Sequence, residues 1–145
     1  MKAIIFILFI GITLSFDTGA ALSYARTYCK NYNPHYNNYR HSGGDCANFV
    51  SQCLKAGGFS FSGCSGQDGK GMLINVGKLT SCLAQKGWKK NSGSFGAGHP
   101  FFLKDLSHAM LAAGVSGNTI KIYGHTNDRC GDASISRSSV ITYSP

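Results

Sequence analysis

The sequence contains no glutamate, and all six of its acidic residues are aspartates. Charged residues make up only 14% of the 145 residues, too few for a long solvated helix or a coiled coil. Three prolines and glycines without a triplet period exclude collagen, although glycine is frequent at 19 residues. No internal repeat or domain linker is present. With 43% hydrophobic residues, the chain is expected to fold as one globular domain with many turns.

The shortage of acidic groups leaves the chain basic. Fourteen Lys and Arg residues give a net charge of +8, which favours contact with anionic polymers or surfaces. A small basic ribonuclease could use two histidines and a lysine as acid, base and phosphate clamp. However, the sequence places no base-stacking aromatics beside a basic strip, so we expect no nucleic-acid partner.

One long apolar run occurs, over residues 3–14, directly after a lysine. It meets Asp17 too soon to form a membrane span, which needs about 20 apolar residues. The pattern predicts a secretory signal peptide over residues 1–15, with no stable membrane span and a secreted mature chain of residues 16–145. Cleavage is expected after Ser15, with Ala20 as the alternative, because Asp17 is well placed to cap the helix that follows.

Six cysteines lie in the predicted mature chain, an even number that in an oxidising compartment suggests disulfides. No CxxC pair and no Cys/His cluster with finger-like spacing occurs among them, so neither a metal nor a cofactor is expected. The cysteines are Cys29, Cys46, Cys53, Cys64, Cys82 and Cys130.

The most informative segment predicts a helix over residues 46–56, which follows a Gly-Gly turn and has Asp45 as N-cap. Cys46 is then the first helical residue, where unpaired N–H groups and the helix dipole favour a thiolate and can hold an oxyanion. The alternative is that Cys46 is half of a disulfide. Cys53 lies on the buried face of the same helix and is expected to be a core residue.

If Cys46 is reserved for chemistry, five cysteines remain and cannot all pair within one chain. We therefore expect two disulfides, with Cys53 buried and reduced. The four paired residues would be Cys29, Cys64, Cys82 and Cys130.

A thiolate nucleophile needs an imidazole base and a group that orients it. Among five histidines, His108 is the preferred base, because it stands at the mouth of a predicted hairpin over residues 109–124. A turn at Ser116-Gly117 would place it opposite His125, whereas a turn at Gly117-Asn118 would place it opposite Asn127. His35 and His41 are expected in solvated loops, and His99 at the start of a strand.

The segment from Gly43 to Gly58, with Asp45-Cys46-Ala47-Asn48-Phe49 near its start, resembles the signature of the "putative amidase domain" family. This family is placed among the NlpC-like, papain-fold cysteine peptidases and amidases. The likeness continues to Ser107-His108-Ala109-Met110 and to His125-Thr126-Asn127-Asp128. It implies that Cys46 is the nucleophile, His108 the general base and His125 the third polar residue.

Two features depart from the family pattern. The sequence has Gly98-His99-Pro100 where such domains often carry Gly-Asp, so that His99 could face the cleft. The segment over residues 64–75 is glycine-rich where relatives commonly place an aromatic wall, which leaves the substrate specificity open.

The expected fold is α+β, a papain-like or NlpC-like single domain in which N-terminal helices pack on a small antiparallel sheet. Helices are predicted over residues 17–30 and 46–56, with a third from residue 76 that ends at Gly87. Strands are predicted over residues 101–103, 109–115, 119–123 and 139–143.

The leading functional interpretation is a secreted, monomeric cysteine hydrolase that cleaves amide bonds through an acyl-enzyme, with a bacterial cell-wall peptide or amide as substrate. The bacterial cell wall as substrate is implied mainly by the resemblance, and the basic charge adds a little support. The alternative is a non-catalytic, disulfide-stapled basic binding or antimicrobial protein. A count of free thiols separates the two.

Overall fold

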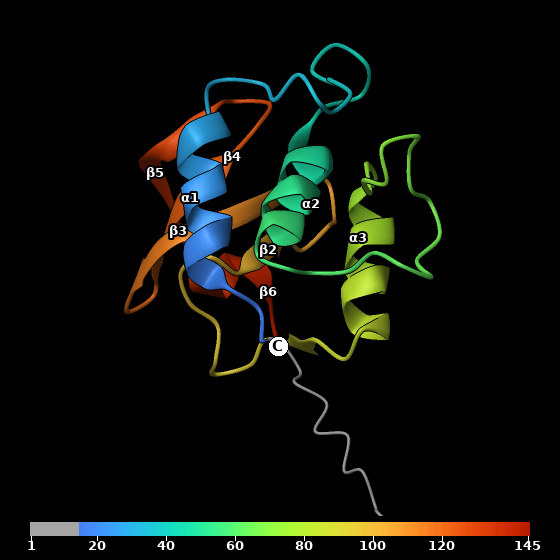
Figure 1. Ribbon diagram of the computed structural model, residues 1–145. Helices are drawn as coiled ribbons and strands as arrows, with labels where there is room; N and C mark the ends of the chain where they lie inside the picture. Colours follow the sequence, from blue (N-terminus) through green and yellow to red (C-terminus); the bar gives the residue numbers. More distant parts are fainter. Residues whose placement is uncertain (1–14) are drawn as a thin grey trace, which may run out of the picture.

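The computed structural model of the chain describes residues 15–145, so most of the predicted signal peptide lies outside the described residues. Three helices lie on one side of a single sheet (Figure 1): α1 (Thr18–Tyr28), α2 (Cys46–Ala56) and α3 (Val76–Gln85). The α2 bounds are those predicted from the sequence. Asp17 caps α1 as expected, because its Oδ1 accepts a hydrogen bond of 2.9 Å from the amide of Ala20.

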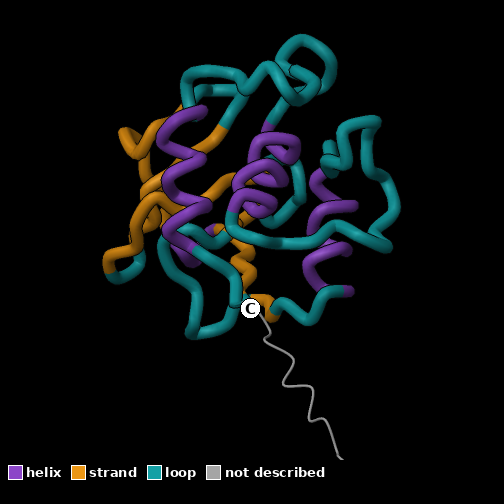
Figure 2. The backbone as a smooth tube through the Cα atoms, viewed as in Figure 1, coloured by secondary structure: helices purple, strands orange, loops and turns teal. Residues whose placement is uncertain are grey.

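The sheet has six antiparallel strands in the order β1-β6-β2-β3-β4-β5. Figure 2 shows the helices, in purple, in front of the orange strands. Their bounds are β1 Lys89–Lys90, β2 Pro100–Leu103, β3 Ala109–Ser116, β4 Thr119–Gly124, β5 Arg129–Ser136 and β6 Val140–Ser144. A 3-10 turn at Arg137–Ser139 precedes β6. The α+β prediction is confirmed. Strands β1 and β5 were not predicted, because β1 has two residues and β5 is rich in small polar residues with little buried surface.

The hairpin between β3 and β4 corrects the predicted pairing of His108. The two-residue turn is Gly117-Asn118, since Ser116 pairs with Thr119. A bulge between Ala112 and Gly114 then shifts the register by one residue. Beyond the bulge, the register of the hairpin places neither His125 nor Asn127 opposite His108, and β4 ends at Gly124.

The two faces of the sheet are covered unequally. The helices pack on one face, where residues such as Leu54 and Leu79 meet Phe102 and Tyr143. The other face carries a smaller cluster of strand and loop residues, to which the helices contribute none of the described members. Alternate residues of β2 belong to the two clusters, as the period of a strand requires: Phe102 faces the helices and Phe101 faces away. The start of α2, with Cys46, therefore lies on the face of the sheet that the helices cover.

Two disulfides are present, as predicted. Cys29–Cys130 joins the end of α1 to β5, and Cys64–Cys82 joins the glycine-rich loop to α3. Cys46 and Cys53 are unbridged, and Cys53 is fully buried. Burial raises the pKa of the Cys53 thiol well above its ordinary value, so this cysteine stays protonated in the core.

No helix within residues 15–145 combines the length and the apolar character that crossing a membrane requires.

Candidate active site

Cys46 occupies the first position of α2 and is partly exposed. The turn before it depends on glycine, since Gly43 and Gly44 have φ values of 97° and 100°, a region that other residues rarely adopt. In the described part of the chain, no hydrogen-bond acceptor faces the backbone amides of Cys46, Ala47 and Asn48. The thiol therefore lies beside unpaired N–H donors at the positive end of the helix dipole.

Asp45 holds the N-cap position, but its side chain makes no capping hydrogen bond, which corrects the prediction. Its carboxylate is fully buried. Oδ1 accepts from the amide of Tyr39 and from the side chain of Asn48, both at 2.9 Å, while Oδ2 lies 2.6 Å from Nδ1 of His125. Asp45 thus links the start of α2 to the loop before it and to the end of β4.

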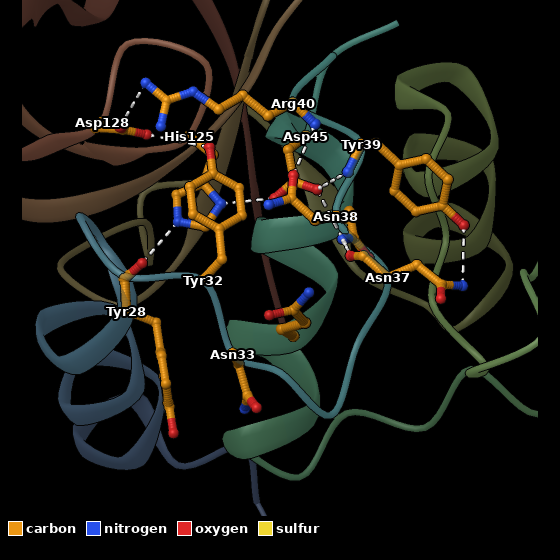
Figure 3. A network of polar contacts seen from close by, with 12 residues as sticks. Tyr28, Tyr32, Asn33, Asn37, Asn38, Tyr39, Arg40, Asp45, His125 and Asp128 are labelled. Atoms are coloured by element: carbon orange, nitrogen blue, oxygen red, sulfur yellow. Dashed lines mark hydrogen bonds and ion pairs between the residues drawn. The ribbon is translucent and has the colours of Figure 1, made fainter. Parts of the chain in front are cut away.

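His125 is buried in a stack of rings, with 1% of its surface exposed. Its centroid lies 4.0 Å from that of Phe49 and 4.1 Å from that of Tyr32. Figure 3 shows the Tyr32 ring over the imidazole. Nδ1 meets the Asp45 carboxylate and Nε2 meets the carbonyl of Tyr28, each at 2.6 Å. The Tyr28 carbonyl can only accept, so Nε2 donates to it and Nδ1 is left for the carboxyl group of Asp45. The two side chains form a buried hydrogen-bonded pair.

A second polar layer covers this pair on the solvent side. The hydroxyl of Tyr32 donates to Asp128 at 3.2 Å, and Arg40 forms an ion pair with Asp128 at 3.3 Å. The guanidinium of Arg40 also lies over the Tyr32 ring, 5.7 Å from its centroid. Figure 3 shows these residues bridging from the loop after α1 to the loop after β4. The layer shields His125 from water.

The loop after β4 is conformationally strained next to the site. Thr126 and Asp128 have φ values of 83° and 46°, which are uncommon for residues other than glycine. Thr126 also lies close to the Gly44 turn, since a Cβ built on Gly44 would be 3.5 Å from its hydroxyl. The buried His125 pair and the Cys29–Cys130 disulfide hold this loop in place.

His108 stands immediately before β3 and is half-buried. Burial lowers the pKa of its imidazole from the ordinary value of 6.5, so the ring is neutral at neutral pH. Within residues 15–145, its ring nitrogens make no hydrogen bond, which leaves them available to a reacting group. Nε2 lies at the end of β4, 4.0 Å from where a Cβ on Gly124 would be.

The structure brings Asp45 and His125 together beside Cys46, but it does not join His125 to His108. Both nitrogens of His125 are taken by Asp45 and Tyr28. Cys46 packs against the cluster that contains Ala109, the neighbour of His108, although no hydrogen bond links the thiol and the imidazole in the described residues. Asn127, the alternative third residue, is exposed in the loop after β4.

The remaining three histidines lie where the sequence predicts them, with His99 immediately before β2. His35 and His41 are in exposed loop positions. His99 accepts a 3.0 Å hydrogen bond from the amide of Gly96 through Nδ1 and lies among the rings of Phe16 and Trp88. Burial lowers the pKa of His99 below its ordinary value. Its surroundings are those of a structural residue.

The residues that surround His125 were not predicted from the sequence. Tyr28 contributes a backbone carbonyl, which no sequence pattern reveals. One signal was available for Asp45: an aspartate directly before a helical cysteine must leave its carboxylate near the start of that helix. Among residues 15–145, no group of three or more His, Cys, Asp or Glu side chains is arranged to hold a metal ion.

Comparison with known families assigns the domain. Residues 15–97 match the family described as "Putative amidase domain". The chain belongs to this family. The matched residues of the putative amidase domain include α2, which begins at Cys46, and end before β2. The match therefore assigns no role to His108 or His125, which lie beyond it. Neither the search of curated proteins nor the search of solved structures found a match.

Proposed function

We propose that this putative amidase domain is a cysteine hydrolase that cleaves amide bonds, with Cys46 as nucleophile and His108 as general base. Family membership suggests amide hydrolysis. The observation that carries the proposal of cysteine chemistry is the unbridged Cys46 at the start of α2, although four of the six cysteines are paired. The unpaired amides around it are suited to an oxyanion.

The proposed reaction runs in two steps. The Cys46 sulfur attacks the amide carbonyl carbon while His108 accepts the thiol proton, and the carbonyl oxygen becomes an oxyanion near the amides of Cys46 and Ala47. The C–N bond then breaks as His108 returns that proton to the leaving amine, which leaves a thioester. In the second step, His108 takes a proton from water as the resulting hydroxide attacks the thioester carbonyl carbon. The C–S bond then breaks, His108 returns the proton to the sulfur, and the carboxylic acid leaves.

His125 was predicted as the third catalytic residue, and we propose that it acts as a positioning residue through Asp45. The Asp45 carboxylate is held between His125 and the Tyr39 amide, and its backbone leads directly into Cys46. A buried pair of this kind fixes the start of α2 and the loop after β4 relative to each other. An orienting role for Asn127 toward His108 stays the alternative.

We propose a bacterial cell-wall peptide or amide as the substrate. The net charge of +8 supports this, since anionic wall polymers concentrate basic proteins. The test is incubation of the purified mature chain with peptidoglycan, followed by mass spectrometry of the new termini. We expect products with new amine and carboxyl ends, absent with Cys46→Ala. Equal products from both proteins would exclude Cys46 as nucleophile.

The alternative, a non-catalytic basic binding protein, is weakened by the unbridged Cys46, because that interpretation makes Cys46 half of a disulfide. It would regain support if the wild-type chain bound peptidoglycan without releasing any new terminus.

We also propose that the chain is secreted and cleaved after Ser15. Two disulfides are compatible with an oxidising compartment. The ring of Phe16 packs edge-on against Trp88 at 5.0 Å, and the amide of Asp17 donates to the carbonyl of Gly57 at 2.8 Å. Cleavage after Ala20 would remove both contacts. N-terminal sequencing of the mature protein should therefore start at Phe16 and not at Ala21.

A further inference from the structure

A cavity of about 250 Å³ opens on the sheet face that the helices leave uncovered. Its position follows from the pairing of β6 with β2, in which Thr142 lies opposite Phe101 and Val140 opposite Leu103. Phe101, Leu103 and Val140 all belong to the cluster on that face. The cavity is therefore separated from Cys46 by the sheet. It is lined by Asn91, Lys104, Arg137, Ser138, Val140 and Thr142.

Thr142 brings an unpaired hydroxyl to this cavity. The residue is 1% exposed, and Oγ1 has no hydrogen-bond partner within residues 15–145. The backbone of the same residue is fully satisfied, because its amide donates to Oδ1 of Asn91 at 3.1 Å and its carbonyl accepts from the Asn91 amide at 2.8 Å. A buried hydroxyl without a partner is costly, and a bound group with acceptor oxygens would satisfy it.

Asn91 and Arg137 offer further donors at the cavity. Asn91 uses its side-chain oxygen for Thr142, so its amide nitrogen is the end left for a ligand. The guanidinium of Arg137 is held by the carbonyl of Ser92 at 3.1 Å and by the Phe95 ring at 5.3 Å. These contacts fix the guanidinium in place and leave further N–H groups unused.

Lys104 adds a second positive charge at the edge of the cavity, and none of the six lining residues is acidic. Neither cation forms an ion pair within residues 15–145, and two positive charges match a dianion better than a single carboxylate. A volume of about 250 Å³ is slightly below the roughly 300 Å³ at which pockets for drug-sized ligands begin, and suits a small anion.

We infer that this cavity is a phosphate-binding site, in which Lys104, Arg137, Asn91 and Thr142 donate to the phosphate oxygens. The site takes a phosphate dianion, whether as the free ion or as an ester on a larger molecule. It is independent of the proposed hydrolysis, because Cys46 lies across the sheet.

The test is a titration with inorganic phosphate at constant ionic strength and near neutral pH. Calorimetry and backbone NMR shifts monitor the binding. We expect saturable binding with shifts centred on residues 91, 104, 137 and 142. Lys104→Gln should weaken binding about tenfold, since it removes a charge-assisted hydrogen bond. Lys70→Gln is the matched control, because Lys70 is an exposed lysine in the loop before α3. It should leave the affinity unchanged.

Thr142→Val gives a second readout that a folding defect cannot imitate. Without phosphate, this variant should be at least as stable as the wild type, because the hydroxyl it removes has no partner. With phosphate, it should gain less thermal stability than the wild type. Lys104→Gln should retain the hydrolytic activity, and Cys46→Ala should retain phosphate binding.

Several outcomes would contradict the proposed phosphate-binding site. Equal losses from Lys70→Gln and Lys104→Gln, or unchanged affinity in Thr142→Val, would show general charge attraction or an adventitious ion only. Binding of acetate as tight as that of phosphate would remove the preference for a dianion. Comparison with phenyl phosphate identifies the source: tighter binding of the ester assigns a phosphorylated molecule, and tighter binding of phosphate assigns the free ion.

Discussion

The imidazole of His125 and the carboxylate of Asp45 meet at 2.6 Å in the interior, although 80 residues separate them in the chain. Both side chains are 1% exposed. Asp45 is covalently next to the proposed nucleophile, whereas His125 follows the last residue of β4. This pair adds a polar link to the apolar packing between the Cys46 helix and the hairpin that follows His108.

Substitution of Asp45 by Asn should lower both stability and turnover. Loss of one partner leaves a buried polar group without its hydrogen bond, which costs about 1–3 kcal/mol. His125→Gln should have a similar effect, and the double variant should lose less than the sum of the two, which denaturant unfolding would measure. Tyr32→Phe is the mild control, because it keeps the ring stack and loses only the hydrogen bond to Asp128.

The proposed positioning role predicts a second effect of these substitutions, on the reactivity of Cys46. If Asp45 and His125 act through Cys46, iodoacetamide labelling of Cys46 in folded protein should change its rate and pH profile in both variants. Labelling identical to the wild type would mean that the pair only stabilises the fold. A strong loss of turnover in Asn127→Ala, with His125→Gln near wild type, would assign the third role to Asn127.

The two free thiols should react very differently. Treatment of the native, unreduced protein with iodoacetamide should label Cys46 and abolish hydrolysis, while Cys53 stays unmodified because it is fully buried. Peptide mapping by mass spectrometry gives both extents. A disulfide at Cys46 in active protein, or loss of activity without Cys46 labelling, would contradict the proposed chemistry.

The pH dependence of hydrolysis should follow His108. Burial lowers the pKa of this imidazole below 6.5, so the acid limb of kcat/KM should lie below that value. His99→Gln should leave the limb in place, because His99 packs among aromatic rings away from the thiol. An acid limb above pH 6.5 would contradict the assignment of His108 as the base.

Stability should also depend on pH in a defined direction. The pKa values of His99 and His108 are lowered in the fold, so the unfolded chain binds protons more readily than the native state. Their contribution to the free energy of unfolding is present above pH 6.5 and is lost as the pH falls through the lowered pKa values. Urea unfolding at a series of pH values should show this decline, and it should be smaller in His99→Gln.

The two disulfides should differ in their effect on activity. Cys29–Cys130 flanks both Tyr28, whose carbonyl accepts from His125, and the strained loop after β4. Replacement of both its cysteines by Ser should lower turnover about tenfold or more through misplacement of the site. Replacement of Cys64 and Cys82 by Ser is the control.

The control pair should lose stability but keep turnover near wild type, when both proteins are assayed at a temperature at which they are folded. The Cys29–Cys130 pair should lose more stability, because its residues are 101 apart in sequence against 18 for the other pair. Equal effects on turnover would mean that the first disulfide has no special relation to the site.

The sequence by itself determined the features that depend on neighbouring residues. The bounds of α2 follow from its apolar spacing and from the glycines at both ends, and these are local. The position of Cys46 at the first helical residue follows from the same pattern. The two-disulfide arrangement was predicted by reserving Cys46 and assigning Cys53 to the buried face of a helix.

Only the tertiary structure decided which distant groups meet. The bulge in β3 moved the register of the hairpin by one residue, and such a bulge has no clear local signature. The Asp45 carboxylate does not cap α2 as predicted, because it is hydrogen-bonded in the interior to the Tyr39 amide, Asn48 and His125. Three hydrogen bonds to a buried carboxylate outweigh one exposed cap, and their geometry exists only after the loops and the sheet have assembled.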